Sequence, residues 1–284
     1  MRNRLMNPSR FLKIGFLIGL FLIIGIEATA QKKIKGDKEV ISVSGDINQP
    51  FRSIVIGNDI KLTLQQAPNN SYVLTTDQNL VDQIDFNVTD EILTISTGIK
   101  ITSNKKLEVF LKYIGLEGLT LNDKSEVISK ERIVSEMFKI NSNGDSKFNI
   151  LADVGSLDLN MHKTSSGKID LKSGHLYLKM KDRSDLKGDL NLTNLDLLLE
   201  NSASLDAKGE IDKAILNLSG RSDLKAKKLK IRTANLNTSN TSDIHIFVSK
   251  AIEILAEGKS KIYLYGNPEI SLKGLTDKSR IIKK

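Results

Sequence analysis

Two aspartates late in the chain, Asp223 and Asp243, are the residues whose type and spacing most readily indicate chemistry. Each directly follows a serine, in two segments of similar pattern. Some exported enzymes cut acidic polysaccharides with clustered aspartates and calcium, and Ca²⁺ prefers such oxygen ligands. The same carboxylates also fit a screened polar face, because Lys261 occupies the equivalent position in the next segment of this pattern. Both interpretations remain open, and we assign neither aspartate to a metal site.

Histidine and cysteine offer little further chemistry. The histidines are His162, His175 and His245, and none has a second ligand four residues away, so a metal site would need the fold to gather distant residues. The chain has no cysteine and no Gly-x-Ser-x-Gly elbow, which excludes thiol chemistry and a serine hydrolase of that type. We therefore predict a non-enzyme, with no catalytic, cofactor-binding or metal-binding residue.

Basic residues alternate with apolar residues in one segment of the sequence and form a basic cluster. Its members are Lys225, Lys227, Lys228, Lys230 and Arg232, between Leu224, Ala226, Leu229 and Ile231. This pattern fits a patch for anionic glycan or lipopolysaccharide, and it equally fits a solvated face that discourages side-on aggregation of strands. The outward tyrosines (Tyr177, Tyr263 and Tyr265) favour sugar binding little, because the chain has no tryptophan and sugar platforms usually offer more stacking surface.

The aspartates, serines and basic residues recur because a sequence repeat of about 20 residues runs between positions 124 and 266. Each copy combines a strand, a polar turn with a small residue, and a second strand. The spacing stays close to the repeat length throughout, and we expect the apolar anchors at Val127, Phe148, Ile169, Leu186, Leu205, Leu224, Ile244 and Ile262. The small turn residues two positions earlier are Ser125, Ser146, Gly167, Ser184, Ala203, Ser222, Ser242 and Ser260.

The repeat length predicts an all-β fold, a parallel β-solenoid or β-helix-like stack of short strands. Two short strands and two turns fill each copy, which is too short for a propeller blade and lacks the helical period of a leucine-rich repeat. No proline occurs between Pro68 and Pro268, as expected where nearly every backbone N–H donates to a neighbouring coil. We also expect the residues after four anchors to stack as a ladder of alternating charge: Asp170, Lys187, Asp206 and Lys225.

The rest of the chain is expected to be less regular. A short helix is predicted after Asp77, which we expect to cap it, and Pro268 is expected to end the ladder. The predicted organisation is a signal peptide over residues 1–30, a flexible leader over 31–47, a β-solenoid domain over 48–275 and a C-terminal tail over 276–284. Within that domain, residues 48–113 form a less regular N-terminal β module and residues 114–268 form the repeat coils.

The N-terminal segment predicts export. Four basic residues precede an uncharged run from Ile14 to Ile26, which is too short to span a bilayer but typical of a signal peptide. Ala28 and Ala30 provide small residues for cleavage before Gln31, and an uncleaved anchor is the alternative. Cleavage leaves no predicted transmembrane segment and a net charge of +5, so we expect no nucleic-acid partner. The predicted location is the periplasm, the outer membrane or the surface of a Gram-negative bacterium.

Three segments together resemble a known family. They are residues 51–66, residues 91–95 and the closing run 262–268, accompanied by the serine-turn repeats. In order and ending they are similar to the putative auto-transporter adhesin, head GIN domain family, over about residues 48–275. The resemblance implies an exported Gram-negative envelope protein with a β-solenoid fold and no catalytic residues to transfer. The chain departs from the family's Ser-Gly-Ser-Gly-like turns at Arg183-Ser184-Asp185 and Arg221-Ser222-Asp223.

The expected function is therefore a non-enzymatic cell-envelope or surface protein, an adhesin-like binding module for a glycan, a protein or an envelope surface. Extended solenoid surfaces suit such binding better than they suit a deep pocket. Two alternatives remain open: a structural periplasmic solenoid that forms homo-oligomers through its ends, and a polysaccharide-active enzyme.

Overall fold

The computed structural model describes residues 32–284, so the predicted signal peptide lies outside the described residues. Among those residues, no helix is long and apolar enough to cross a membrane. The N-terminal part contains β1 (Lys33–Lys35), β2 (Val40–Asp46), β3 (Ser53–Ile56), β4 (Lys61–Gln66), β5 (Ser71–Asp77), η2 (Gln78–Gln83), β6 (Ile84–Thr89), β7 (Ile92–Thr97), β8 (Lys100–Ser103) and β9 (Leu107–Tyr113).

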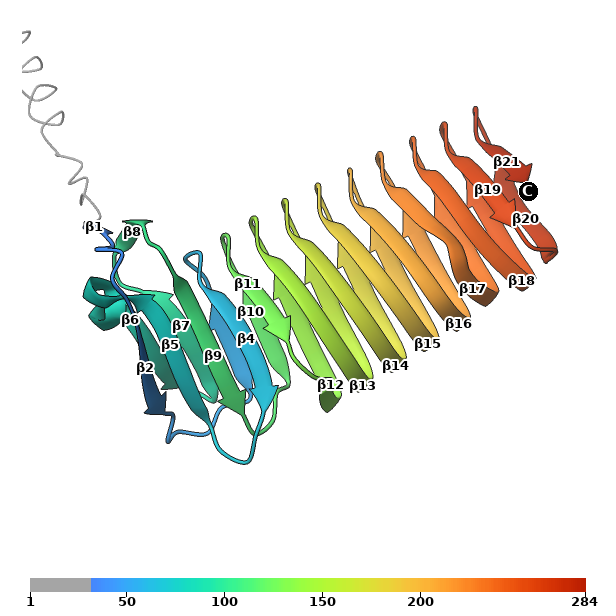
Figure 1. Cartoon of the computed structure of the whole chain (residues 1–284). Helices are drawn as coiled ribbons and strands as arrows, with labels where there is room; N and C mark the ends of the chain where they lie inside the picture. Colours follow the sequence, from blue (N-terminus) through green and yellow to red (C-terminus); the bar gives the residue numbers. More distant parts are fainter. Residues whose placement is uncertain (1–31) are drawn as a thin grey trace, which may run out of the picture.

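The remaining strands stack as parallel coils in chain order, as Figure 1 shows, and they form a solenoid of about nine turns. The predicted all-β solenoid is thereby confirmed. These strands are β10 (Gly118–Leu121), β11 (Glu126–Ser129), β12 (Ile133–Ser142), β13 (Lys147–Met161), β14 (Ser166–Met180), β15 (Asp185–Leu199), β16 (Ser204–Leu218), β17 (Asp223–Thr238), β18 (Asp243–Ala256), β19 (Lys261–Tyr265), β20 (Glu269–Leu275) and β21 (Arg280–Lys283).

Each long strand bends once and thereby forms two sides of its coil. In β13, buried and solvent-facing residues alternate up to Val154, two outward residues follow, and the alternation resumes at Leu157. Two consecutive outward residues mark a corner, because strict alternation would send one of them into the core. We call the outward side chains equivalent to residues 147–154 the first face and those equivalent to 156–161 the second face.

The opposite corner of every coil is a tight turn with one left-handed residue. Its φ is positive at Asp123, Gly144, Lys163, Asp182, Asn201, Gly220, Asn240, Gly258 and Asp277. At Gly220 a Cβ would lie 2.7 Å from the backbone of Asn201 in the preceding coil, so this turn has no room for a side chain. The serine two residues later is buried, and Ser184 Oγ donates to the carbonyl of Lys181 at 2.8 Å. The same side-chain bond to the carbonyl three residues earlier forms at Ser125, Ser242 and Ser260, where it adds to the backbone bonds of the turn.

One predicted anchor is wrong. Phe148 lies beside Gly167, and Gly167 lies beside Leu186, so Gly167 occupies the anchor position and Ser165 the turn position of that coil. The ring of Phe148 fills the space that a Cβ on Gly167 would need. Ile169 is buried one inward position further along. The other predicted anchors are confirmed as buried and mutually aligned: Val127, Leu186, Leu205, Leu224, Ile244 and Ile262.

The same shift corrects the predicted charge ladder. Lys168, rather than Asp170, stacks beside Lys187, followed by Asp206 and Lys225. The ladder therefore begins with two like charges and alternates only around Asp206. Asp170 lies in the neighbouring column, where Arg132 Nη2 binds its carboxylate at 2.8 Å.

Segments expected to be irregular at the two ends are also paired. Within the expected flexible leader, β1 pairs with β8 and β2 pairs with β5. The short helix η2 is confirmed, but the buried Asp77 does not cap it, and its carboxylate accepts from the backbone N–H groups of Lys38 and Lys105. Pro268 does not end the ladder, because β20 pairs with β18 and β21, within the expected tail, pairs with β19.

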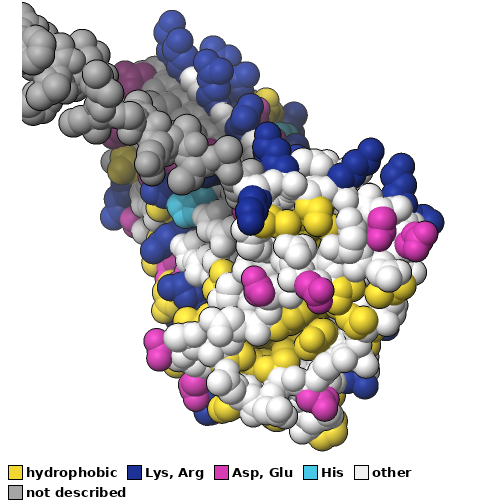
Figure 2. Space-filling model, turned by 90° about the vertical axis from the view of Figure 1, so that its left-hand side faces the viewer, with side chains coloured by type: hydrophobic (Ala, Val, Ile, Leu, Met, Phe, Trp, Pro, Cys, Tyr) yellow, Lys and Arg dark blue, Asp and Glu magenta, His cyan; other side chains and the backbone are white. Residues whose placement is uncertain are grey.

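The two ends of the stack differ. At the N-terminal end, Figure 2 shows hydrophobic side chains gathered near the middle of the surface, and the rings of Tyr72 and Phe86 stack 3.9 Å apart. At the other end, Ile270, Leu272 and Leu275 continue inward-facing columns of β18 yet are exposed. The last coil therefore leaves apolar positions uncovered.

Candidate binding surface

The aspartates singled out from the sequence lie side by side on adjacent coils. Asp223 and Asp243 are neighbours in the register of β17 and β18. Each has a cationic or imidazole neighbour on its own strand: Asp223 Oδ2 lies 2.9 Å from Lys225 Nζ, and Asp243 Oδ1 lies 3.4 Å from His245 Nε2. The hydrogen bond and charge of Asp223 raise the pKa of Lys225. Within residues 32–284, no cluster of three His, Cys, Asp or Glu side chains is arranged to hold a metal ion.

The histidines are dispersed over the molecule. His175 lies on the second face, where its Nε2 is 2.8 Å from Asp196 Oδ2 and its ring stacks on Tyr177. His245 lies on the first face and stacks on Tyr263, whereas His162 lies in a turn. The fold therefore does not gather the imidazoles into one site.

Two of the five residues of the basic cluster pair with carboxylates of the preceding coil. Lys230 Nζ lies 3.0 Å from Glu210, and Arg232 Nη1 lies 2.9 Å from Asp212, and both carboxylates belong to β16. Lys227 lies over the ring of Tyr265. These partners make the solvated face the better interpretation of the cluster, because a polyanion would compete with carboxylates already in place.

The second face presents amides, small side chains and exposed apolar groups. Asn160 Nδ2 donates to Asn141 Oδ1 at 3.3 Å, and Asn237 Nδ2 donates to Asn217 Oδ1 at 3.0 Å, so amides form ladders across neighbouring coils. Large hydrophobic side chains exposed at outward positions of this face are Ile92, Met137, Tyr177, Ile215 and Leu255. Clustered exposure of this kind is typical of interaction surfaces.

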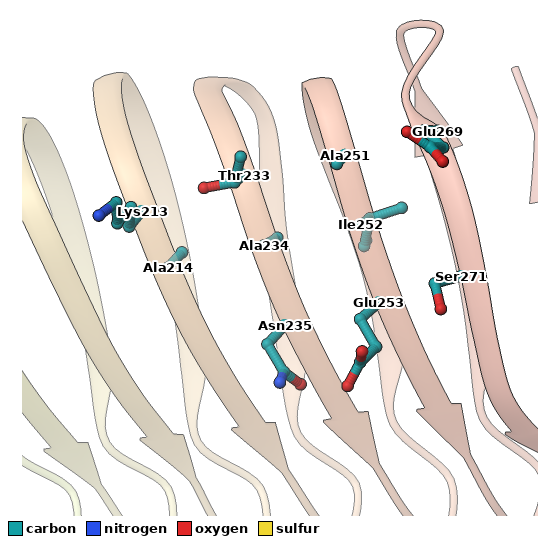
Figure 3. Close-up of a pocket in the computed structure, with 10 residues that line it drawn as sticks. All are labelled: Lys213, Ala214, Thr233, Ala234, Asn235, Ala251, Ile252, Glu253, Glu269 and Ser271. Atoms are coloured by element: carbon teal, nitrogen blue, oxygen red, sulfur yellow. The ribbon is translucent and has the colours of Figure 1, made fainter.

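Shallow depressions lie along the second face, and two of them lie at outward positions of β16–β20 and of β3–β14. One, of about 450 Å³, is drawn in Figure 3, and its lining comes from β16, β17, β18 and β20. Thr233 and Ala251 leave room there, with Lys213 and Glu269 on either side in the same column. The other depression, of about 700 Å³, lies nearer the N-terminus and includes Met137 and Tyr177.

We call the larger depression the Tyr177 groove. Its floor follows one outward column across six strands, in the order Ile92, Ser53, Gly118, Lys139, Asp158 and Tyr177. The small residues at the second and third positions lower the floor between bulkier neighbours. Sequence reasoning missed this groove, because Ser53 and Gly118 are distant in the sequence and become neighbours only when β10 stacks on β3.

Solved structures with the same fold include proteins from two Parabacteroides species. A putative adhesin from Parabacteroides merdae is 16% identical, with a TM-score of 0.62, covering 90% of this chain and 100% of that one. A putative adhesin from Parabacteroides distasonis is 19% identical, with a TM-score of 0.65, covering 89% and 98%. A putative lipid binding protein from the same species is 18% identical, with a TM-score of 0.61, covering 89% and 100%. At these identities the likeness shows the fold alone.

Sequence similarity gives the family directly. No curated protein matches the chain significantly. The profile of the putative auto-transporter adhesin, head GIN domain matches residues 50–171 and residues 154–268, which together cover most of the chain. The two matched regions overlap within β13 and β14, as expected where similar coils follow one another without a break. This chain therefore belongs to the putative auto-transporter adhesin, head GIN domain family.

Proposed function

We propose that this protein is exported and acts as a non-enzymatic, adhesin-like binding module at the cell envelope or surface, with its second face as the ligand-binding surface. The observation that carries the proposal is the contrast between that face and the first face. Exposed Met137 and Tyr177 border the Tyr177 groove, whereas the columns of the first face are mostly charged and include the pairs Lys208–Asp189 and Lys230–Glu210. The predicted signal peptide and the names of the structural neighbours support the location and the role.

Binding to surfaces tests this function. Labelled protein beginning at Gln31 is incubated with isolated Gram-negative cell envelopes and with intact epithelial cells. We expect saturable binding to at least one of them, and weaker binding after Met137→Glu, which places a charge on the exposed second face. The matched control is Lys187→Glu on the first face, which should bind like the unchanged protein. No saturable binding to either surface, or equal loss in both variants, would contradict the proposal.

A second candidate function is self-assembly into a structural solenoid, and the C-terminal end favours it. Ile270, Leu272 and Leu275 are exposed there, and the outer backbone edges of β20 and β21 pair with no other described strand. Such edges are templates for pairing with another chain. Sedimentation over a range of concentrations tests this candidate. Oligomers that dissociate after Leu272→Lys would support it, and a monomer at every concentration would reject it.

A further inference from the structure

The Tyr177 groove is long and runs along the solenoid axis, across the strands. Its floor column spans six strands from Ile92 to Tyr177. At about 4.8 Å per strand this distance is roughly 24 Å. Gly118 has no side chain, and a Cβ there would collide with the hydroxyl of Ser53. The groove therefore has the length and shape to hold a linear ligand of several units.

A fixed aromatic ring stands at one end of the groove. Tyr177 is 43% exposed, and its ring stacks on His175 with centroids 3.9 Å apart and planes 8° apart. His175 Nε2 lies 2.8 Å from Asp196 Oδ2, so a carboxylate holds the supporting ring. A ring already held in place loses little freedom when a ligand packs against it. The negative face of an aromatic ring attracts C–H groups of the kind that one side of a pyranose presents.

The polar lining offers hydrogen-bonding groups while its charges nearly cancel. Asp158 and Asn141 belong to this lining, and Asn160 beside it donates Nδ2 to Asp158 Oδ1 at 2.9 Å, which orients the carboxylate. Lys139 Nζ lies 3.6 Å from the same Asp158 carboxylate, and Glu117 pairs with Arg52 at 2.6 Å. Lys179 is the remaining cation in the lining. Such a lining suits hydroxyl groups and gives a polyanion little net attraction.

We propose that the Tyr177 groove binds a saccharide chain of low net charge, which lies along the solenoid axis and packs one sugar against Tyr177. This inference rests on the proposed function and names its ligand class. A β-strand peptide fits less well, because addition of a strand requires a free sheet edge and these strands are paired on both sides. An acyl chain fits less well, because it would cover Asp158, Asn141 and Lys179 without giving them hydrogen bonds.

Calorimetry with the protein beginning at Gln31 tests the inference. The probes are the neutral hexasaccharides cellohexaose, chitohexaose, maltohexaose and mannohexaose, with hexagalacturonate as the charged comparison. We expect at least one neutral probe to bind, and its affinity to fall at least about tenfold in Tyr177→Ala and in Ser53→Gln, which fills the floor. Tyr177→Phe should retain binding. The matched control is Tyr263→Ala, which removes a tyrosine that stacks on His245 of the first face and should change affinity less than about twofold.

Several results would overturn the inference. They are dissociation constants weaker than about 1 mM for every neutral probe, binding of hexagalacturonate alone, and an affinity that Tyr177→Ala leaves unchanged. Thermal unfolding of each variant checks that the fold is retained. Periodate, which cleaves vicinal diols of sugars, separates this inference from the proposed function. Because 4-linked N-acetylglucosamine units have no vicinal diol, envelopes are treated with periodate followed by chitinase. Envelope binding that survives both treatments rejects the saccharide but leaves the binding function standing, whereas no binding to untreated envelopes rejects the function itself.

Discussion

The first and second faces are built by the same strands, yet they differ in what accompanies their charged pairs. On the first face, Lys208 Nζ lies 2.9 Å from Asp189, Lys230 lies 3.0 Å from Glu210, and Arg132 binds Asp170. Each pair joins different coils, so stacking itself brings the partners together. The second face also has pairs between coils, such as Lys139 with Asp158 and Lys273 with Glu253, but its columns place amides, small residues and exposed apolar groups among them. A solenoid can thus give one side mostly charged columns and give the other side uncharged groups that a ligand can contact.

The hydrophobic core behind the first face differs from the core behind the second face. We call these the first and second halves of the core. Behind the second face, one inward column contains an unbroken run of leucines: Leu159, Leu178, Leu197, Leu216 and Leu236. Behind the first face, Phe148 compensates for Gly167, and Gly188 and Ala207 follow each other in the next column. The strand register also shifts near Lys228. The uniform leucine column supports the second face evenly. Differences in side-chain size and strand register between coils occur behind the first face.

The largest expected effect concerns the leucine column. Leu178→Ala should lower the free energy of unfolding by about 2–5 kcal/mol, because Leu178 is fully buried and its neighbours above and below cannot fill the space. Urea denaturation measures the change. Asn160→Ala on the exposed side of the same half is the control and should cost far less. A loss of unfolding free energy below about 1 kcal/mol for Leu178→Ala would mean that the core behind the second face is loosely packed.

The next effect concerns Phe148 and Gly167, which pack against each other in the core behind the first face. Gly167→Ala should lower the free energy of unfolding by about 1–3 kcal/mol, because the added methyl group meets the Phe148 ring. Phe148→Leu combined with Gly167→Ala should recover part of that loss, since a smaller side chain makes room. Recovery in the double variant would confirm the alignment of these two coils, and simple addition of the two losses would refute it.

This pair also shows why sequence reasoning placed one coil wrongly. Seven of the eight predicted turn residues are correct, because a serine or alanine there is followed two residues later by a large apolar side chain. In the third coil that rule selects Gly167 and Ile169, since Gly167 itself holds the anchor position. The anchor's volume comes from Phe148 in the preceding coil, and no local pattern reveals such compensation. The Tyr177 groove was hidden for the same reason, because its floor combines residues from strands distant in sequence.

A smaller effect separates the two faces in binding. Ile215→Glu on the second face should weaken envelope binding by about threefold to tenfold, because it puts a carboxylate on an apolar part of the proposed contact surface. Tyr263→Glu on the first face is the matched control, since that residue also points outward from a central strand position. Titration of labelled protein onto envelopes measures both affinities. If the first-face variant weakens binding more than Ile215→Glu, the roles of the two faces are reversed.

The smallest expected effect concerns the charge ladder of the first face. Asp206 lies between Lys187 and Lys225, so Asp206→Lys produces a column of four lysines that begins with Lys168. This change should lower the free energy of unfolding by about 1 kcal/mol or less. Asn235→Lys on the second face is the control and should be nearly neutral, because its neighbour on the next coil is the carboxylate Glu253. Both measurements use urea denaturation at low salt, because salt screens exposed charges.

The pH dependence of that cost identifies its cause. The hydrogen bond and charge of Asp223 raise the pKa of Lys225, and the charge of Asp206 adds to this. A raised folded-state pKa stabilises the protein below the unfolded lysine value of about 10.5, and this stabilisation is lost as pH rises through the folded value. Asp206→Lys removes one cause and adds repulsion between ammonium groups, so its cost should be full near pH 7 and shrink above about pH 11 as the lysines lose their charge. If the loss of unfolding free energy stays constant over this pH range, it arises from packing rather than from charge. Charge would then not be what distinguishes the two faces.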